Sequence, residues 1–467
     1  VRDNEGNIIT VGITDRDTTS HDFTTIKYSG NGELLWAQIY ADSTRSEYEY
    51  CNDVVVDNNG SIYTTGSWMD EQETMQGIQT LKYSTSGNLL WKRKYILQES
   101  YVISLSQKIL TDNNSNIYCI GTSLSQTASD GTNYSIVKYD SNGTQLWNRE
   151  FFVPVHEHFS DFTFDNTGNL IYAFTDYSDS TSEDFRTVKI TPNDGNVVWS
   201  KTKNNTYYSE DHPIAFRKDS FGNIFILADN GNHGLICIKY DNAGNQLWDI
   251  KDISKIPLQM DVDEDGNSFI LSRHKDSLGH YYTTTKVNAQ GVVQWNAKYY
   301  ARWDLPFNYP EDAKVRTDNF GNAYVIGTEV VEDDQNFFVL KYNAQGTQEW
   351  VTHYSYPITN SYDRFLGMNI LTNQKIVITS TSSFHDTLGY NKIVTTLCYN
   401  SSGNQLWVNH YSENNFELQF TAIDLKVDDS ANVFVLIKSL TTPSPYGYAV
   451  VQYDSGGNLM QTVKSDT

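Results

Sequence analysis

Asp57-Asn58-Asn59-Gly60, followed by Lys82-Tyr83 and by Gly87-Asn88-Leu89-Leu90-Trp91, is the stretch that decides the fold. The runs before and between these landmarks are rich in Val, Ile, Thr and Tyr, the residues that favour strands. Asp, Asn and Gly form tight turns because Gly accepts a positive φ and Asp caps the turn's own backbone. The stretch therefore predicts four antiparallel strands joined by hairpins, which is one blade of a β-propeller.

The same landmarks recur along the whole chain. Tryptophans return every 47 to 57 residues, and Met460 stands at the ninth place. A fixed period of this size is typical of a repeat architecture, because each unit buries its apolar faces only against its neighbours. The Asp turn is missing only from the eighth unit, which has Leu371-Thr372-Asn373-Gln374 instead. The tryptophans are Trp36, Trp91, Trp147, Trp199, Trp248, Trp295, Trp350 and Trp407, and the turn aspartates are Asp3, Asp57, Asp112, Asp165, Asp219, Asp263, Asp318 and Asp428.

These nine units predict an all-β chain folded as a single β-propeller of nine four-stranded antiparallel blades, with eight blades as the alternative. The whole chain, 1–467, is expected to be one domain because no linker interrupts the repeats. We expect strand one of each blade to be innermost and the Asp turns to share one face. In the first blade, strand one is shortened to Val1-Arg2-Asp3. The expected blades are 1–47, 48–102, 103–156, 157–209, 210–255, 256–308, 309–361, 362–416 and 417–467.

The repeated tryptophans are predicted to pack between neighbouring blades. A side chain of this size buries on the order of 150 to 250 Å² and is costly to expose repeatedly along one chain. We therefore expect the Leu-Trp positions to hold blades together and to take no part in ligand binding.

In these landmarks the chain resembles the bacterial SBBP-type β-propeller repeat family, whose units carry the Asp-x-x-Gly-Asn strand, the Lys-Tyr strand and the Gly-Asn-x-Leu-Trp ending. The resemblance extends over essentially the whole sequence. It implies a secreted or cell-surface bacterial protein, often with further domains in the same chain, and no single activity. Seven blades are usual in that family, so nine units depart from its pattern.

Composition restricts the partners. The formal net charge of −23 opposes binding to nucleic acid and to anionic membranes, which require a basic face, and favours a neutral or cationic partner. No run of 18 apolar residues predicts a membrane helix, and Val1 to Asn7 already lie inside a repeat, so no signal peptide is visible in this chain. The four cysteines, Cys51, Cys119, Cys237 and Cys398, lie in apolar strands of four different repeats, where we expect buried free thiols.

Variable segments are predicted to gather on the rim opposite the short turns, because the strand-two to strand-three inserts and the blade-to-blade crossings all end there. Loops on a rigid scaffold are the usual place for binding. Aromatic side chains in these loops would stack on a sugar or anchor a peptide; the alternative is that they fill the mouth of a large ring. The candidate binding residues are Trp303, Phe307, Tyr309, Tyr356, Tyr362 and Trp68.

In one segment, acidic residues are spaced as the ligands of a metal ion often are. Asp261, Asp263 and Asp265 precede Gly266 in a pattern that begins a calcium loop, because alternating carboxylates converge on a hard cation. Asp263 and Gly266 also belong to the standard turn of every repeat, and Phe269 stands where a further acidic ligand is expected. Calcium at this loop is the one cofactor that we consider.

Two functions follow from the sequence. The favoured one is a non-catalytic binding or scaffold module that engages a protein or a carbohydrate at the variable loop face, since no nucleophile elbow, zinc helix or phosphate loop is present. The alternative is a propeller enzyme acting on polysaccharide, a glycoside hydrolase or lyase, with loop carboxylates as acid and base. A pair of carboxylates in a concave pocket, one with a raised pKa, would favour the enzyme.

Overall fold

The computed structural model describes residues 1–17, 20–30, 33–40, 48–70, 76–96, 101–125, 131–153, 159–178, 182–203, 212–230, 234–252, 254–302, 313–331, 334–386, 389–411, 419–428, 430–440 and 447–464. The chain divides into two compact units, Val1–Tyr208 and Ser209–Thr467. Each unit is described by itself below.

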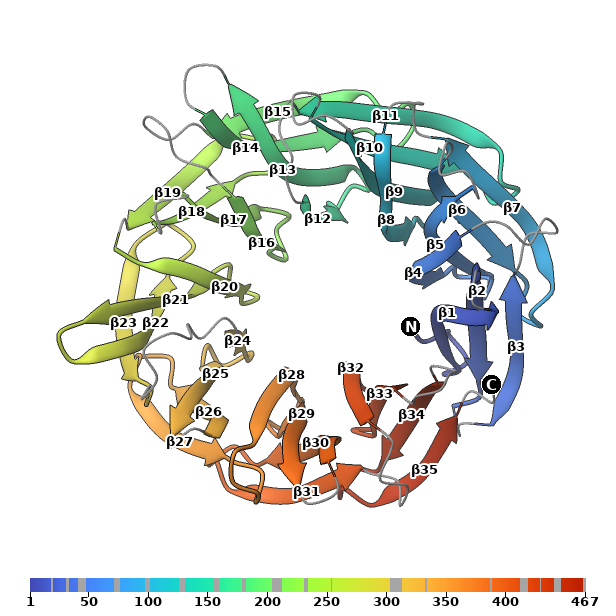
Figure 1. Ribbon diagram of the computed structural model, residues 1–467. Helices are drawn as coiled ribbons and strands as arrows, with labels where there is room; N and C mark the ends of the chain where they lie inside the picture. The colour runs from blue at the N-terminus through green and yellow to red at the C-terminus, as the bar shows by residue number, and fades with distance from the viewer. Residues whose placement is uncertain are drawn as a thin grey trace. The chain divides into compact units, whose positions relative to one another are not determined.

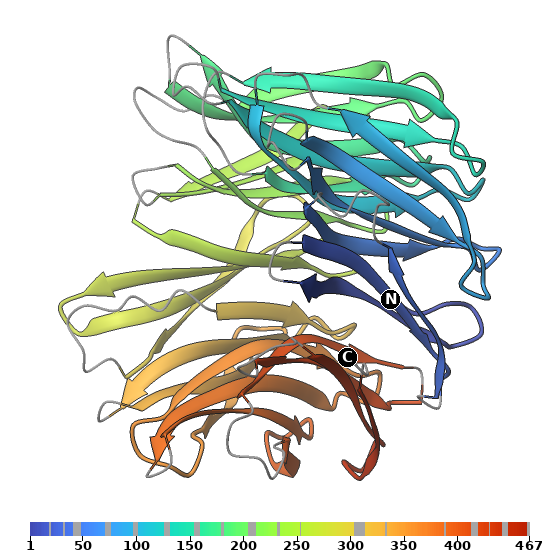
Figure 2. The same cartoon turned by 45° about the vertical axis from the view of Figure 1, so that its right-hand side comes forward.

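Strands account for all the regular structure of the described residues (Figures 1 and 2). In the first unit they are β1 (Ile8–Asp17), β2 (Ser20–Tyr28), β3 (Leu34–Tyr40), β4 (Tyr48–Val56), β5 (Ile62–Met69), β6 (Gln76–Tyr83), β7 (Leu89–Ile96), β8 (Tyr101–Thr111), β9 (Ile117–Ser125), β10 (Thr132–Tyr139), β11 (Gln145–Val153), β12 (Phe159–Phe164), β13 (Leu170–Ser178), β14 (Ser182–Ile190) and β15 (Val197–Lys203).

The second unit contains β16 (His212–Lys218), β17 (Ile224–Asp229), β18 (Leu235–Tyr240), β19 (Gln246–Asp252), β20 (Ile256–Val262), β21 (Ser268–Asp276), β22 (Gly279–Val287), β23 (Val293–Tyr300), β24 (Ala313–Thr317), β25 (Ala323–Val331), β26 (Asp334–Tyr342), β27 (Gln348–Tyr354), β28 (Tyr362–Ile370), β29 (Ile376–Asp386), β30 (Gly389–Tyr399), β31 (Gln405–Tyr411), β32 (Gln419–Val427), β33 (Val433–Leu440), β34 (Gly447–Tyr453) and β35 (Leu459–Lys464).

Consecutive strands pair antiparallel into four-stranded sheets: β4–β7, β8–β11, β12–β15, β16–β19, β20–β23 and β32–β35. The sheet β1–β3 has three strands, and Arg2 adds one isolated bridge to Ile8, as expected for a shortened first strand. Strands β24–β27 and β28–β31 form two such sets that are joined into one eight-stranded sheet.

Within each unit the first strands of successive sheets are neighbours. Strand β4 contacts β1 and β8, and β16, β20, β24, β28 and β32 contact one another in turn (Figure 1). Four-stranded meanders that succeed one another in this way are the blades of a β-propeller. The all-β propeller class is therefore confirmed, whereas the count of nine blades and the single domain stay predictions.

The Asp turn works as the sequence predicts. In the second repeat, Asp57 Oδ1 accepts hydrogen bonds from the backbone N–H groups of Asn59 and Ser61, both at 2.9 Å. Gly60 takes a φ of 78°, in the left-handed region that favours glycine. Tyr63, at the start of β5, donates its hydroxyl to Asp57 Oδ2 at 3.0 Å. The turn carboxylate is therefore saturated by donors of its own blade.

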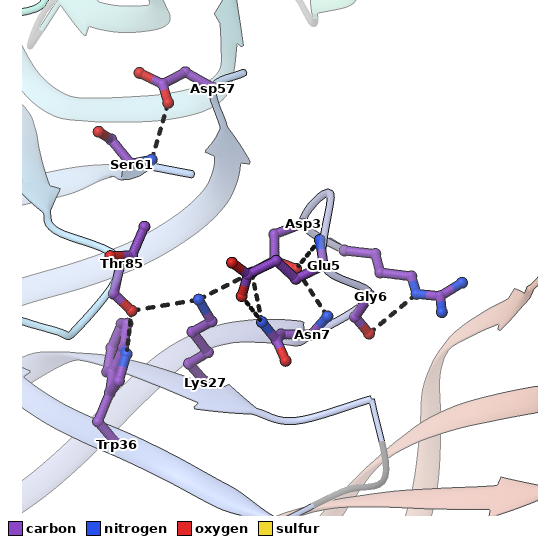
Figure 3. A network of polar contacts seen from close by, with 10 residues as sticks. Asp3, Glu5, Gly6, Asn7, Lys27, Trp36, Asp57, Ser61 and Thr85 are labelled. Atoms are coloured by element: carbon purple, nitrogen blue, oxygen red, sulfur yellow. Dashed lines mark hydrogen bonds and ion pairs between the residues drawn. The ribbon is translucent and has the colours of Figure 1, made fainter. Parts of the chain in front are cut away.

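The lysine of the Lys-Tyr signature completes this network. Lys27 pairs with Asp3 at 2.9 Å and donates to the carbonyl of Thr85 in the next sheet at 3.3 Å (Figure 3). Equivalent buried pairs are Lys189–Asp165 at 2.6 Å and Lys239–Asp219 at 3.3 Å. Although burial opposes ionisation, hydrogen bonds from the lysine and the turn asparagine hold the pKa of Asp3 below its ordinary value and that of Asp165 at about 2. Lys27 thus joins the turn of Asp3 to its own third strand and to the following blade, and Lys239, which donates to the carbonyl of Ala289 at 3.3 Å, does the same for Asp219.

The tryptophans lie between neighbouring blades, as predicted. Trp91 Nε1 donates to the carbonyl of Ser141 at 3.1 Å, the same oxygen that accepts from Lys82 at 2.8 Å. In the same turn Gly143 lies so near the indole of Trp91 that a Cβ there would stand 2.9 Å from the ring. The same close approach is found in other strand-three to strand-four turns of both units, where the glycine makes room for the tryptophan of the preceding blade: Gly87 with Trp36, Gly195 with Trp147, Gly291 with Trp248, Gly346 with Trp295, Gly403 with Trp350 and Gly457 with Trp407.

All four cysteines are buried free thiols, as expected from the sequence. The hydrophobic core is divided among clusters that each span two adjacent sheets; one combines Ile9 and Phe23 with Ile62, Leu81 and Tyr83. Because every cluster needs two sheets, a blade gains its stability from its neighbours.

Candidate binding site

Strands β26 and β28 make a contact that joins two blades at their loop ends. Gln335 and Tyr362 pair in parallel, and the backbone N–H of Gln335 donates to the carbonyl of Ser361 at 2.9 Å. The N–H of Ser361 in turn donates to Asp334 Oδ1, also at 2.9 Å. This link fixes the start of β28 against the start of β26.

A pocket of about 500 Å³ opens beside this link. It is built from the first strands β24, β28 and β32 and from the loop ends of β26, β29 and β30, so strands and not loops position its walls. Its lining residues are Lys314, Gln335, Tyr362, Arg364, Phe365, Leu366, Thr381, Ser383, Lys392, Thr421 and Ala422.

The pocket is cationic although the chain as a whole is acidic. Lys314, Arg364 and Lys392 line it, and none of its described lining residues is an Asp or a Glu. Lys314 is held in place because its ammonium donates to the carbonyl of Leu366. Lys392 lies over the ring of Tyr390, 5.6 Å from its centroid. Three positive charges around one hollow favour a negatively charged group.

Polar groups complete the lining. Thr421 Oγ1 is buried and has no hydrogen-bond partner among the described residues, and Gln335 and Ser383 add an amide and a hydroxyl. A buried hydroxyl without a partner costs free energy unless a ligand or a water bonds to it. The pocket therefore offers hydrogen bonds as well as charge.

Four residues of β28, Tyr362, Arg364, Phe365 and Leu366, line the pocket, and they differ in exposure. Successive residues of a strand point to opposite faces, and here Tyr362 and Arg364 are exposed whereas Asp363 and Phe365 are buried. The Tyr362 side chain is 52% exposed. Tyr362 is thus a sequence-predicted residue that the structure places at a pocket.

Asp363 holds the crossing loop before β28. Its Oδ2 accepts a hydrogen bond from the N–H of Tyr356 at 2.7 Å, and the side chain is fully buried. Burial, together with the nearby carboxylate of Asp334, raises the pKa of Asp363 to about 6. Because this carboxyl group faces away from the pocket lining, we assign it to loop anchoring.

Tyr356 takes a packing role. Its ring stacks on Phe384 with centroids 5.2 Å apart and meets the edge of His410 at 5.1 Å. It is half-buried, so the alternative given for the loop aromatics, that they fill space, describes this residue.

The structure assigns no binding contact to the remaining predicted aromatics among the described residues. Trp68, in the first unit, is 3% exposed and lies under Lys94, whose ammonium is 4.2 Å from the ring centroid. Trp303, Phe307 and Tyr309 lie outside the described residues. A binding role for these four residues stays a prediction.

The carboxylates of the proposed calcium loop have partners in the protein itself. Asp261 Oδ2 accepts from the N–H of Thr317 on the next first strand at 2.9 Å, and Asp263 accepts from the N–H and the amide of Asn267, both at 2.8 Å. Asp265 is exposed. Within the described ranges, no group of three His, Cys, Asp or Glu side chains is arranged to hold a metal ion. Asp261 and Asp263 thus serve as structural acceptors in this structure, and calcium at this loop stays a prediction.

Sequence reasoning missed the three cationic residues of the pocket. Lys314, Arg364 and Lys392 stand in three different strands of two blades, so no spacing along the chain brings them together. The available signal was Arg364 beside Tyr362 at the start of a first strand.

No model of a known protein family matches this sequence, and no curated protein does. Solved structures with a similar arrangement include a eukaryotic initiation factor, at 9% identity and a TM-score of 0.47, over 85% of this chain and 88% of that one. The Dos1 propeller is similar at 10% identity and a TM-score of 0.39, over 93% of this chain and 90% of that one. Sqt1 from Chaetomium thermophilum is similar at 11% identity and a TM-score of 0.43, over 79% of this chain and 89% of that one. Within the described ranges, no helix is long and apolar enough to span a membrane.

Proposed function

We propose that this chain is a non-catalytic binding module that holds a protein or glycan partner at the pocket beside β28. One observation carries this proposal: the start of β28 presents Tyr362 and Arg364 to a hollow of about 500 Å³ that Lys314 and Lys392 also line. This volume lies within the range usual for ligand sites.

The pocket's walls favour binding because they are preorganised. Tyr362 is paired with Gln335 on one side and with Ser383 on the other, so its backbone position is fixed before a ligand arrives. A site that is already ordered loses less conformational entropy on binding than a loop does.

The alternative, an enzyme acting on polysaccharide, requires an acid and a base that face the substrate. Asp363 has the raised pKa that such an acid needs, yet its carboxyl group is buried and bonded to the Tyr356 amide. This geometry supports a binding module over an enzyme.

The biological setting belongs to the same proposal. The resemblance to SBBP-type repeats and the net charge of −23 support a module of a secreted or cell-surface bacterial protein, in which the partner is another molecule or another domain of the same chain.

The test is a glycan and peptide array probed with the native chain and with Tyr362→Ala. We expect at least one ligand class to bind the native chain and to lose binding in the variant. Tyr300→Ala, which removes another tyrosine, 41% exposed, is the matched control and should keep the binding. Binding that survives in Tyr362→Ala would place the partner elsewhere and contradict the proposal.

A further inference from the structure

We propose that the ligand of this pocket is a saccharide that carries a carboxylate, a uronic acid residue of a glycan; this inference rests on the binding function proposed above. The lining residues combine three features that such a sugar needs: cationic groups, an exposed aromatic ring, and neutral hydrogen-bonding side chains.

The cations supply the recognition of the carboxylate. A guanidinium binds a carboxylate through two parallel hydrogen bonds, which an ammonium cannot do. Arg364, the one guanidinium among the described lining residues, is exposed at the pocket. We therefore assign the carboxylate to Arg364, with Lys314 and Lys392 as flanking charges.

Tyr362 and the neutral groups supply the recognition of the sugar ring. Exposed tyrosine rings offer an apolar face with a polar tip, and Tyr362 has the largest exposed fraction among the aromatic side chains that line the pocket. Thr421 Oγ1, buried without a partner among the described residues, needs a hydroxyl such as those around a sugar. A simple anion would satisfy the cations but would leave the tyrosine face unused.

The charge of the whole chain selects against a densely charged ligand. A net charge of −23 repels a polyanion, whereas a single carboxylate in contact with Arg364 lies well within the screening length of about 8 to 10 Å. The combination favours a glycan with widely spaced carboxylates over a polyglutamate segment or a heavily sulfated chain.

The experiment measures binding of an oligosaccharide of neutral sugars that carries a single glucuronic acid residue, of its methyl ester and of a polyglutamate peptide to the native chain by calorimetry. We expect the acidic oligosaccharide to bind, and the methyl ester, which lacks the charge, to bind roughly ten- to a hundredfold more weakly, the range for loss of a charge-assisted hydrogen bond. Arg364→Gln should lower affinity for the acidic sugar by a similar factor and leave affinity for the ester unchanged. Lys426→Gln, which removes an exposed lysine whose side chain is 68% exposed and lies outside this pocket, should change neither.

The outcomes separate the two proposals. Equal binding of acid and ester, with loss in Tyr362→Ala, would overturn the uronic acid assignment and keep the binding module. Preference for polyglutamate would likewise overturn the saccharide. Binding of no probe to the native chain would overturn this inference, and an array that also finds no ligand would overturn the function beneath it. Melting temperatures of the variants within about 2 °C of native confirm that a lost signal reports the site, because a change of 1 kcal/mol moves a domain's Tm by about 2 to 4 °C at this size.

Discussion

Strands β16–β19 and β28–β31 are two blades of the same unit that differ at the pair formed by the turn residue and the third-strand residue. In the first, Asp219 and Lys239 form an ion pair whose side chains are 0% and 3% exposed, and Lys239 lies over the ring of Phe225, 4.6 Å from its centroid. In the second, Leu371 and Cys398 replace the two charges, and Val377 replaces the aromatic ring within a core cluster.

The two charges disappear together, and this is what the comparison teaches. A buried pair can be exchanged for apolar residues at little cost, whereas loss of one partner leaves an unpaired buried charge. Hollows of about 380 and 230 Å³ lie on either side of the altered turn, Leu371 to Gln374. The apolar version thus preserves the blade and gives up the lysine that reaches the next one.

The largest effect should come from breaking the pair in the regular blade. Lys239→Met leaves the Asp219 carboxylate buried without its cation, so we expect a loss of about 3 to 5 kcal/mol in the free energy of unfolding. Urea denaturation provides the measurement. The double variant Asp219→Leu with Lys239→Cys copies the second blade and should cost less than the single change. If the double variant loses as much as the sum of both single changes, the pair does not act as a unit.

The pair should also confer acid sensitivity that the apolar blade lacks. The pKa of Asp165, whose carboxylate is bonded to Lys189, is about 2 when folded, below the ordinary value near 3.9. Because the folded pKa is depressed, its stabilisation is complete above pH 4 and is lost as the pH falls toward 2.

Unfolding of native protein and of Asp165→Asn should therefore be compared between pH 5 and pH 2. We expect the gap in unfolding free energy to narrow by about 2 kcal/mol over this window. A gap that stays constant would show that the Asp165–Lys189 pair contributes no charge-dependent stability.

A smaller difference in unfolding free energy is expected between the repeat tryptophans of these two blades, Trp248 and Trp407. Trp248 Nε1 donates to the carbonyl of Ala289 at 3.1 Å, whereas the buried Nε1 of Trp407 has no partner among the described residues. Phenylalanine keeps most of the ring and removes the N–H. We therefore expect Trp248→Phe to cost about 1 kcal/mol more than Trp407→Phe, the net value of one hydrogen bond. Equal losses would mean that ring packing alone sets the contribution of the tryptophans.

The regular blades were predictable from the sequence because their determinants are local. Asp57, Gly60 and Tyr63 lie within one hairpin, and their spacing alone requires the turn and its cap. The Trp91 contact was predictable from size and recurrence. Its acceptor, the Ser141 carbonyl, was not, because it belongs to the next repeat and depends on how the blades pack.

The candidate site was only partly predictable for the same physical reason. Tyr362 is an aromatic residue in a variable crossing, which the pattern identifies. Its partners Lys314 and Lys392 come from other strands, and the Gln335–Tyr362 pairing beside the hollow is a departure from the repeat. A repeated pattern predicts what blades share, and this site is built from residues that its three blades do not share.

The smallest expected effect concerns calcium, where the comparison predicts no response. In the regular blades the turn carboxylates are saturated by the protein's own donors, and Asp261 is likewise bonded to the N–H of Thr317. Addition of EDTA should leave the melting temperature unchanged in native protein and in Asp265→Ala alike. A drop in the native melting temperature that Asp265→Ala abolishes would establish the site and show that Asp261 and Asp263 exchange their present partners for an ion. Such a result would also show that the turn carboxylates of the regular blades are of two kinds, one bound by protein donors and one bound by a cation.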